Sequence, residues 1–278
     1  MRKIFLKKAL GAIAFCAIYW DGAVGAQDLQ QVASVFGRDD REDPLLEEVE
    51  HMQWLGVVYS RESTGGATAL IVSPSCNVIL TAAHVFFDEK GRPWDDEYLF
   101  YHLGVTAVAG RALDLDNMIV GDKLWDENPE KDWIVVKLKE PVENCTYQRV
   151  TEFDSLGEAV FEDEVVEMVA FHGDDNFTEL PKVVRECSFI KQRSNRYLGK
   201  HWEVVAHDCD AVGGASGGAL IHKDSGSLIA IHPGGFYEHG LYGVTMSMFD
   251  LASSPNMAIK VTPEILAAIE QLSVESAD

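Results

Sequence analysis

One serine lies in a run of small residues, VGGASGGA at positions 212–219, which would let a substrate carbonyl approach the backbone closely. A serine hydroxyl is a weak nucleophile at neutral pH. Ser216 therefore needs a base within hydrogen-bond reach and N–H donors for the oxyanion that forms after attack. The run predicts nucleophilic catalysis, and the base has to come from another segment.

Two folds could use this serine. The pentapeptide GASGG at 214–218 also fits the G-x-S-x-G turn of α/β-hydrolase esterases, in which the acid and the histidine follow the serine in the chain. Acids and histidines do follow Ser216, at Asp224, Asp250, His222, His232 and His239. Chain order by itself leaves this alternative open.

Two upstream segments favour the other fold. VILTAAHV at 78–85 places His84 after an apolar, β-branched stretch, among small residues that leave the imidazole room to turn. KDWIVVKL at 131–138 places Asp132 at the start of a second such stretch, where a carboxylate can hold an imidazole. The order His, Asp, Ser is one of the known chain orders of a catalytic triad.

TAAH, the aspartate followed by WIVV, and GASGG in this order resemble the trypsin-like serine peptidases of the chymotrypsin superfamily. The resemblance implies an all-β fold of two six-stranded antiparallel barrels, with the active site in the cleft between them. It also implies a serine endopeptidase that works through an acyl-enzyme. His84 would be the base, Asp132 would fix its tautomer, and the N–H groups of Gly214 and Ser216 would form the oxyanion hole.

A narrower resemblance is to the bacterial glutamyl endopeptidases. It rests on VFGRDDR at 35–41 and IAIHPGG at 229–235. It implies that His232 recognises an acidic substrate side chain. The backbone of Gly234 and Gly235 would pair with the bound peptide as an added strand.

The chain departs from both groups near the pocket. Ala211 stands where the glutamyl enzymes have a small hydroxyl residue, and Asp210 beside it matches the aspartate that selects arginine or lysine in trypsin-like enzymes. The preference for the residue before the cut, P1, therefore stays open between Glu/Asp and Arg/Lys. Ala215 replaces the aspartate that pairs with a new amino terminus in digestive enzymes, so that mode of activation is not expected.

The amino terminus predicts export. A basic start is followed by an apolar run at 9–20 and then AVGA at 23–26, which predicts a signal peptide over 1–26. The apolar run is too short to span a bilayer, so no membrane association is expected after cleavage. We expect a secreted or periplasmic protein with an extension or propeptide at 27–45 and a peptidase domain at 46–278.

Charge limits the partners. The formal net charge is −22, and loss of the basic leader would make it −25. Such a charge disfavours binding to nucleic acid or anionic membranes and keeps the protein soluble. We expect protein or peptide substrates, a monomer, and neither cofactor nor metal. Two alternatives remain, an α/β-hydrolase-type esterase that uses Ser216 and a catalytically inactive trypsin-like binding protein.

Four cysteines remain after the leader, and an even number in an exported protein predicts two disulfides with three possible pairings. The superfamily resemblance favours Cys187–Cys209, beside the nucleophile loop, and Cys76–Cys145, in the first barrel.

Short β-branched or aromatic stretches between turn residues support the β prediction. They lie at 53–59, 67–72, 77–81, 134–138, 165–171, 204–207 and 228–231. We expect a first barrel at about 50–145 and a second at about 155–258. Thr262 can cap a helix over about 263–272 with Pro263 at its first position. The stretch 171–178 is predicted to be a solvated hairpin tip.

Overall fold

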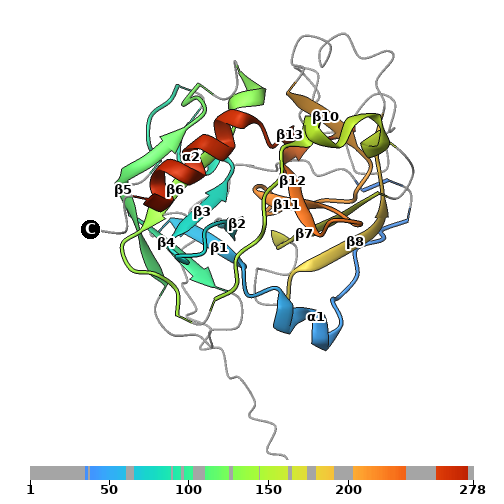
Figure 1. Cartoon of the computed structure of the whole chain (residues 1–278), viewed down its shortest axis with the longest axis horizontal. Helices are drawn as coiled ribbons and strands as arrows, with labels where there is room; N and C mark the ends of the chain where they lie inside the picture. Colours follow the sequence, from blue (N-terminus) through green and yellow to red (C-terminus); the bar gives the residue numbers. More distant parts are fainter. Residues whose placement is uncertain are drawn as a thin grey trace, which may run out of the picture.

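The fold is all-β with two sheets and a closing helix (Figure 1). This computed structural model describes residues 35–36, 38–60, 66–88, 90–94, 97–102, 110–124, 128–143, 145–161, 165–173, 180–190, 203–235 and 255–274. The predicted leader and residues 27–34 lie outside this part. The helices are α1 (Leu46–His51) and α2 (Pro263–Val274), with 3₁₀ turns η1 (Ala83–Val85), η2 (Pro129–Lys131) and η3 (Phe153–Phe161).

The first sheet closes into a barrel in the order β1-β2-β3-β6-β5-β4, with every pairing antiparallel. Its buried interior is built from aliphatic residues with Trp133, Phe100 and Tyr98, which suit a pleated surface. The strands are β1 (Leu55–Ser60), β2 (Gly66–Ile71), β3 (Val78–Thr81), β4 (Tyr98–His102), β5 (Arg111–Val120) and β6 (Ile134–Leu138).

The second sheet has seven described strands in the order β8-β7-β11-β12-β13-β10-β9. We expected six, and the difference is β9, a two-residue strand separated from β8 by Ser188 alone. The strands are β7 (Val166–Ala170), β8 (Lys182–Cys187), β9 (Phe189–Ile190), β10 (Val204–His207), β11 (Gly218–His222), β12 (Ser227–Gly235) and β13 (Asn256–Lys260). All of their pairings are antiparallel, so the α/β-hydrolase alternative is wrong.

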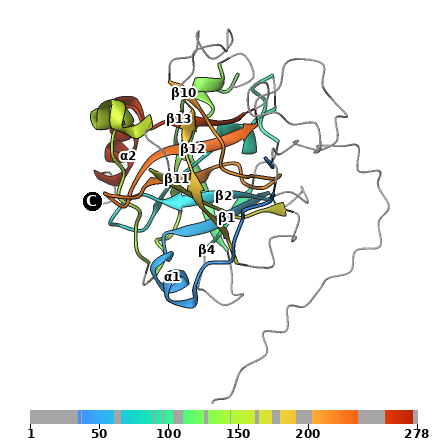
Figure 2. The same cartoon turned by 90° about the vertical axis from the view of Figure 1, so that its right-hand side faces the viewer.

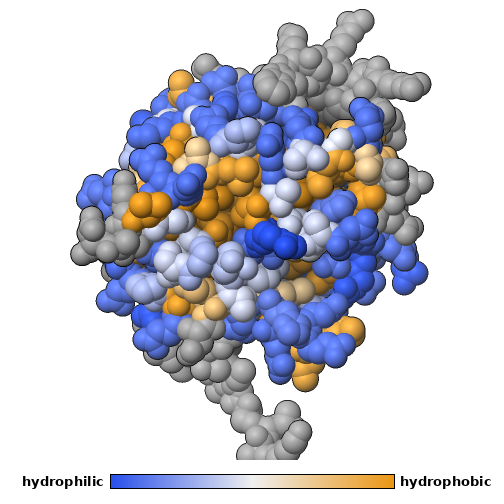
Figure 3. Space-filling model, in the orientation of Figure 1, coloured by the Kyte–Doolittle hydropathy of each residue, from blue (hydrophilic) through white to orange (hydrophobic). Residues whose placement is uncertain are grey.

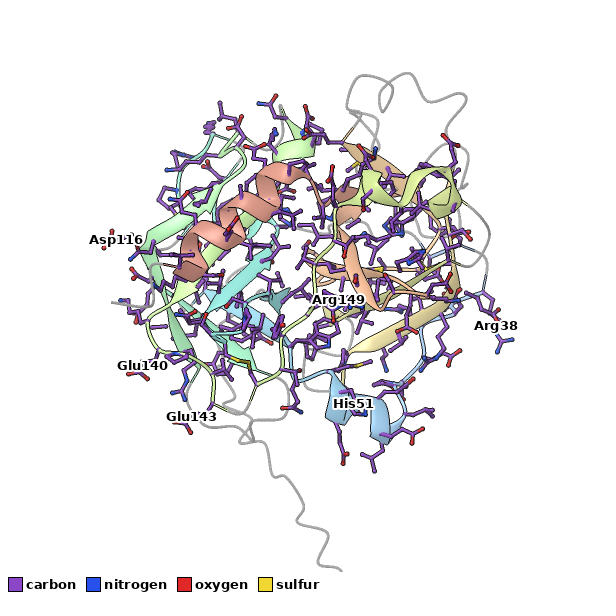
Figure 4. The ribbon with its side chains drawn as sticks, viewed as in Figure 1. Arg38, His51, Asp116, Glu140, Glu143 and Arg149 are labelled. Carbon is purple, nitrogen blue, oxygen red and sulfur yellow. A yellow bond between two sulfur atoms is a disulfide. The ribbon has the colours of Figure 1, made fainter. Side chains whose placement is uncertain are left out.

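A segment after β6 joins the sheets and runs between them (Figures 1 and 2). Arg149, labelled near the centre of Figure 4, lies on this segment. Its Nε donates to Ser227 Oγ over 2.8 Å, and its carbonyl accepts the N–H of Leu228 over 2.8 Å. The joining segment is thereby fixed to β12.

Helix α2 follows the second sheet in sequence but packs on β3, β5 and β6 of the first barrel. Thr262 caps it as predicted, since its Oγ1 accepts the N–H of Ile265 over 3.4 Å. Ile265, Ile269 and Leu272 are buried in the barrel's core. The chain end therefore ties the two halves together. Figure 3 shows the face of the molecule seen in Figure 1, with hydrophobic residues near its middle and hydrophilic residues around them.

Both predicted disulfides are present, Cys76–Cys145 in the first half and Cys187–Cys209 in the second. Asp208 lies near the second pair, but both thiols there are consumed by the disulfide. In the part of the chain described here, no helix is long and apolar enough to cross a membrane.

Candidate active site

His84 lies in the short turn η1 that follows β3. Strand β3 is completely buried between β2 and β6, so the turn after it starts from a fixed base. Trp94 holds the turn from outside, because its indole N–H donates to the carbonyl of His84 over 3.1 Å. The His84 side chain is 8 % exposed, which leaves an edge of the imidazole open to a substrate.

Asp132 lies between η2 and β6, and it is buried. Its Oδ2 lies 2.7 Å from His84 Nδ1, and its Oδ1 accepts the backbone N–H of His84 over 2.8 Å. An ionised carboxylate only accepts hydrogen bonds, so Nδ1 carries the hydrogen and Nε2 is left as the basic nitrogen. One carboxylate thus sets both the place and the tautomer of the imidazole.

Ser216 stands 2.9 Å from that basic nitrogen, measured from Oγ to Nε2. Its hydroxyl also lies 3.1 Å from the carbonyl oxygen of Pro233 on β12. Ser216 is buried, at 5 % exposed. The structure therefore brings His84, Asp132 and Ser216 into one hydrogen-bonded chain.

The loop that carries the serine (residues 209–217, the nucleophile loop) turns through two glycines with positive φ, Gly214 at +95° and Gly217 at +80°. Thr68 on β2 fixes the loop, since its N–H and its Oγ1 each lie 3.2 Å from the carbonyl oxygen of Gly214. With its carbonyl directed at Thr68, the peptide of Gly214 is held by the first barrel. Sequence reasoning missed Thr68 because it lies 146 residues from Gly214.

His232 is buried beside the serine loop, and its carbonyl accepts the N–H of Gly217 over 2.7 Å. Its Nδ1 lies 3.1 Å from Nε2 of His207, which is itself 3.0 Å from the carbonyl oxygen of Met257. Burial lowers the pKa of His207 to about 3. Burial and then the charge that His207 would carry hold the pKa of His232 well below its ordinary value. Both rings are neutral at pH 7.

A carbonyl oxygen can only accept, so Nε2 of His207 carries the hydrogen that it directs to Met257 and His232. Nδ1 of His232 is then an acceptor. A neutral imidazole has one hydrogen, which in His232 therefore lies on Nε2. The pair leaves His232 with one N–H donor on the side away from His207.

Asp210 is buried, at 1 % exposed. Its Oδ1 accepts the backbone N–H of Phe36 over 2.7 Å, and its Oδ2 accepts that of Asp40 over 3.0 Å. Ala211 follows it and is fully buried. The carboxylate is thus bound to a segment from the far end of the chain.

Gly234 and Gly235 lie at the end of β12. There β13 still pairs with them, through Met257 and Asn256, while the pairing with β11 ends at His232. A Cβ built on Gly234 would meet no described atom within 4 Å.

His172 corrects one prediction. We expected 171–178 to be a solvated hairpin tip, but His172 is buried and its Nδ1 accepts the N–H of Val212 over 3.3 Å. The rest of that stretch beyond residue 173 lies outside the described residues. The sequence carried no sign of this contact, because a histidine beside two aspartates is typical of a surface loop.

Comparison with known proteins shows which family the chain belongs to. The trypsin family model matches residues 47–254. The chain belongs to the trypsin family. The fold and the family agree, and the protein is a trypsin-like serine endopeptidase, as predicted.

Solved structures share the trypsin fold at low sequence identity. A Glu endopeptidase in complex with MPD is 14 % identical with a TM-score of 0.63, over 86 % of this chain and 99 % of that one. The protease Anisep from Arthrobacter nicotinovorans is 11 % identical with a TM-score of 0.57, over 80 % and 96 %. The thermostable serine protease AL20 from an extremophilic microorganism is 15 % identical with a TM-score of 0.56, over 82 % and 98 %. No curated protein matches the chain.

Proposed function

We propose that this trypsin-family protein is an exported endopeptidase that cuts peptide bonds through Ser216, His84 and Asp132 and prefers an acidic P1 residue. The observation that carries the proposal is the hydrogen-bonded chain from Asp132 to His84 to Ser216, at 2.7 and 2.9 Å. These distances are those of a base that is already positioned to take the serine proton.

In the first step Ser216 Oγ attacks the carbonyl carbon of the substrate, while its proton moves to Nε2 of His84. Asp132 stabilises the imidazolium that forms. The C–N bond then breaks, and the imidazolium gives its proton to the leaving amine. Water then attacks the acyl-enzyme while His84 takes a proton from it. The imidazolium returns this proton to Oγ of Ser216 as the acyl C–O bond breaks, which releases the acid and the free serine.

The oxyanion formed in each attack would accept hydrogen bonds from the backbone N–H groups of Gly214 and Ser216. Loss of one such donor costs roughly a hundredfold or more in turnover. Two bonds support this role. The N–H of Gly173 donates to the carbonyl of Gly213 over 2.6 Å and so holds the peptide plane that carries the Gly214 N–H, while Thr68 binds the carbonyl of Gly214 in the next peptide.

His232 and Asp210 favour an acidic over a basic P1 residue. His232 keeps one N–H donor after its bond with His207, and a carboxylate is the acceptor that would satisfy a buried donor best. Both carboxylate oxygens of Asp210 already accept hydrogen bonds from the backbone N–H groups of Phe36 and Asp40, so they are not free to form the paired hydrogen bonds that an arginine or lysine would need.

The substrate backbone would lie against the end of β12. Strand β11 no longer pairs at Gly234 and Gly235, so among the described strands that edge of β12 is open there. An extended peptide can add to such an edge as a further strand.

Export is supported by the two disulfides, since such bonds persist in oxidising compartments. Sequencing the amino terminus of protein recovered outside the cytoplasm tests it. A first residue at or after Gln27 is expected, and an intact leader would contradict export by this route.

The test of the catalytic proposal is cleavage of matched peptides that differ only at P1, with Glu, Asp, Gln, Lys or Arg. We expect kcat/KM to be highest for Glu and to fall about tenfold or more for Gln. Asp132→Asn should lower kcat roughly 10⁴-fold, because it imposes the wrong imidazole tautomer, and His84→Ala and Ser216→Ala should each lower kcat roughly 10⁶-fold.

His232→Gln should lower kcat/KM for the Glu peptide at least tenfold and have much less effect on the Gln peptide. His222→Gln is the matched control, since His222 lies on β11 and bonds Ser225. Best cleavage after Lys or Arg would overturn the acidic preference. Absence of cleavage of every peptide would favour the inactive binding protein instead.

A further inference from the structure

The buried carboxylate of Asp210 takes no part in the steps above, although it lies only six residues before the nucleophile. A buried carboxylate is unfavourable unless it is hydrogen-bonded. Its two backbone donors come from the N-terminal segment (residues 35–36 and 38–43), at Phe36 and Asp40, which lie 174 and 170 residues away in the chain. The side chain of Asp40 adds a further hydrogen bond. Asp210 and this segment hold each other in place.

The N-terminal segment is also fixed at its other end. Glu42 and Val183 on β8 exchange two backbone hydrogen bonds, each of 2.9 Å. Lys182, beside Val183, pairs with Asp43 over 2.7 Å. Arg38, between Phe36 and Asp40, is exposed, and Figure 4 shows it projecting from the edge of the molecule. The segment therefore connects the edge of the second sheet with the nucleophile loop.

Asp210 lies on the short stretch between two fixed points of that loop. Before it, Cys209 is bonded to Cys187, and its carbonyl accepts Nδ2 of Asn256 over 2.8 Å. After it comes the turn closed by the N–H of Ala215 and the carbonyl of Val212, at 3.1 Å, which contains Gly214. Oxyanion donors act only when they lie about 2.7–3.1 Å from the developing charge, so a shift of Asp210 that moved this turn would misplace the Gly214 N–H.

We propose that the N-terminal segment is part of the catalytic apparatus: its Phe36 and Asp40 amides hold Asp210, and through Asp210 they hold the loop that presents Gly214 and Ser216. Asp210 is then a positioning residue that does not select the substrate. The inference rests on the proposed role of Ser216. It also limits maturation, because any processing has to leave Phe36 and Asp40 in the chain.

The test removes each donor from the full chain while the rest of the backbone stays. Phe36→Pro and Asp40→Pro lack the N–H, whereas Phe36→Ala and Asp40→Ala lose the same side chains and keep it. The readouts are kcat and KM on the best peptide of the P1 series, and the rate of Ser216 labelling by a fluorophosphonate. Arg38→Ala is the surface control.

We expect each proline variant to have a kcat and a labelling rate at least tenfold below those of its alanine counterpart, with KM changed less than twofold. Asp210→Asn should lower kcat similarly without changing the order of the P1 series. In the Asp210→Asn protein, the proline substitutions should lower kcat little further, because the side chain that the Phe36 and Asp40 amides bind is already altered. Circular dichroism and Tm identify any variant that fails to fold, in which case Asp210→Asn decides.

Proline and alanine variants with equal kcat and equal labelling would overturn the inference and leave the proposed function intact. So would an Asp210→Asn enzyme that keeps its kcat, or one that loses cleavage after Lys and Arg only, since Asp210 would then be a pocket residue. If the wild-type protein itself is not labelled at Ser216, the proposed function and this inference both fail.

Discussion

At the scale of single residues, the site depends on Gly217, a position where no side chain fits. Gly217 follows the nucleophile with φ +80°, and a Cβ there would lie 2.1 Å from the carbonyl oxygen of Thr68. Thr68 also binds the Gly214 carbonyl, so the contact is between the first barrel and the nucleophile loop itself. No side chain can be added at Gly217 without moving one of them.

Gly217→Ala should therefore lower the free energy of unfolding by about 2 kcal/mol or more through strain and overlap, and kcat by at least tenfold. Gly226→Ala is the matched control, because Gly226 also has a positive φ, +64°, but has open space around it. Urea unfolding and peptide cleavage measure both effects. Equal losses for the two variants would contradict the account of the loop.

Asp40 provides a test by pH. Burial and the charge of Asp210 raise the pKa of Asp40 to about 7, from 3.8 when unfolded, while Asp39 next to it faces Arg41. A raised pKa means that the folded state holds the proton more tightly, so stability falls as pH rises from about 4 to about 7.

Asp40→Asn should remove that fall, and its Tm should gain on the wild type as pH rises through this window. Asp39→Asn is the control. Hydrogen bonding to Arg41 lowers the pKa of Asp39, so its pH-dependent contribution to stability lies below about pH 4, and its Tm difference from the wild type should stay nearly constant from pH 4 to pH 7. A Tm difference for Asp40→Asn that also stays constant from pH 4 to pH 7 would show that Asp40 and Asp210 are not coupled.

At the scale of elements, the sequence predicts what local pattern determines. Strands β6 and β10 match their predicted bounds, and α2 extends only two residues past its prediction, because each has a clear apolar pattern or cap. Strand β11 begins at Gly218 within the glycine run, and β5 carries polar residues and a register shift, so neither resembles a strand locally. Both segments are strands because neighbouring strands pair with them on both sides, β12 and β7 with β11, and β4 and β6 with β5.

The same reason separates the features of the site that were predicted from those that were not. His84, Asp132 and Ser216 each lie in a recognisable local motif. The contacts of Thr68, His172 and Asp210 join segments far apart in the chain, and no local pattern specifies them.

Helix α2 offers a test of how the elements are held together. Ile265 is fully buried against the first barrel, so Ile265→Ala should cost about 2–5 kcal/mol of stability. Val274, at 66 % exposed, is the control, and Val274→Ala should cost less than about 0.5 kcal/mol. Chemical denaturation measures both, and similar costs would contradict the packing of α2 on the barrel.

At the scale of the whole molecule, two sheets carry different parts of one site, His84 and Asp132 on the first and Ser216 on the second. Three segments hold these parts in place. The joining segment is bonded to β12, and α2 packs on the first barrel. The N-terminal segment is bonded to both β8 and the nucleophile loop.

The two disulfides should differ in what they protect. Cys76–Cys145 spans 69 residues and Cys187–Cys209 spans 22, which correspond to about 4 and about 3 kcal/mol in the chain-entropy model. Replacing the first pair by alanine should lower Tm and leave kcat within about twofold. Replacing the second should also lower kcat, since Cys209 adjoins Asp210. The reverse order of effects on kcat would contradict this account.

The central claim is that His84 makes Ser216 a nucleophile. The most direct measurement is covalent labelling of the full chain by a fluorophosphonate, with the modified residue located by mass spectrometry and the rate compared with that of His84→Ala. The account predicts one label per molecule, on Ser216, and a rate at least a thousandfold lower without the imidazole. Labelling at another residue, or an unchanged rate in His84→Ala, would contradict it.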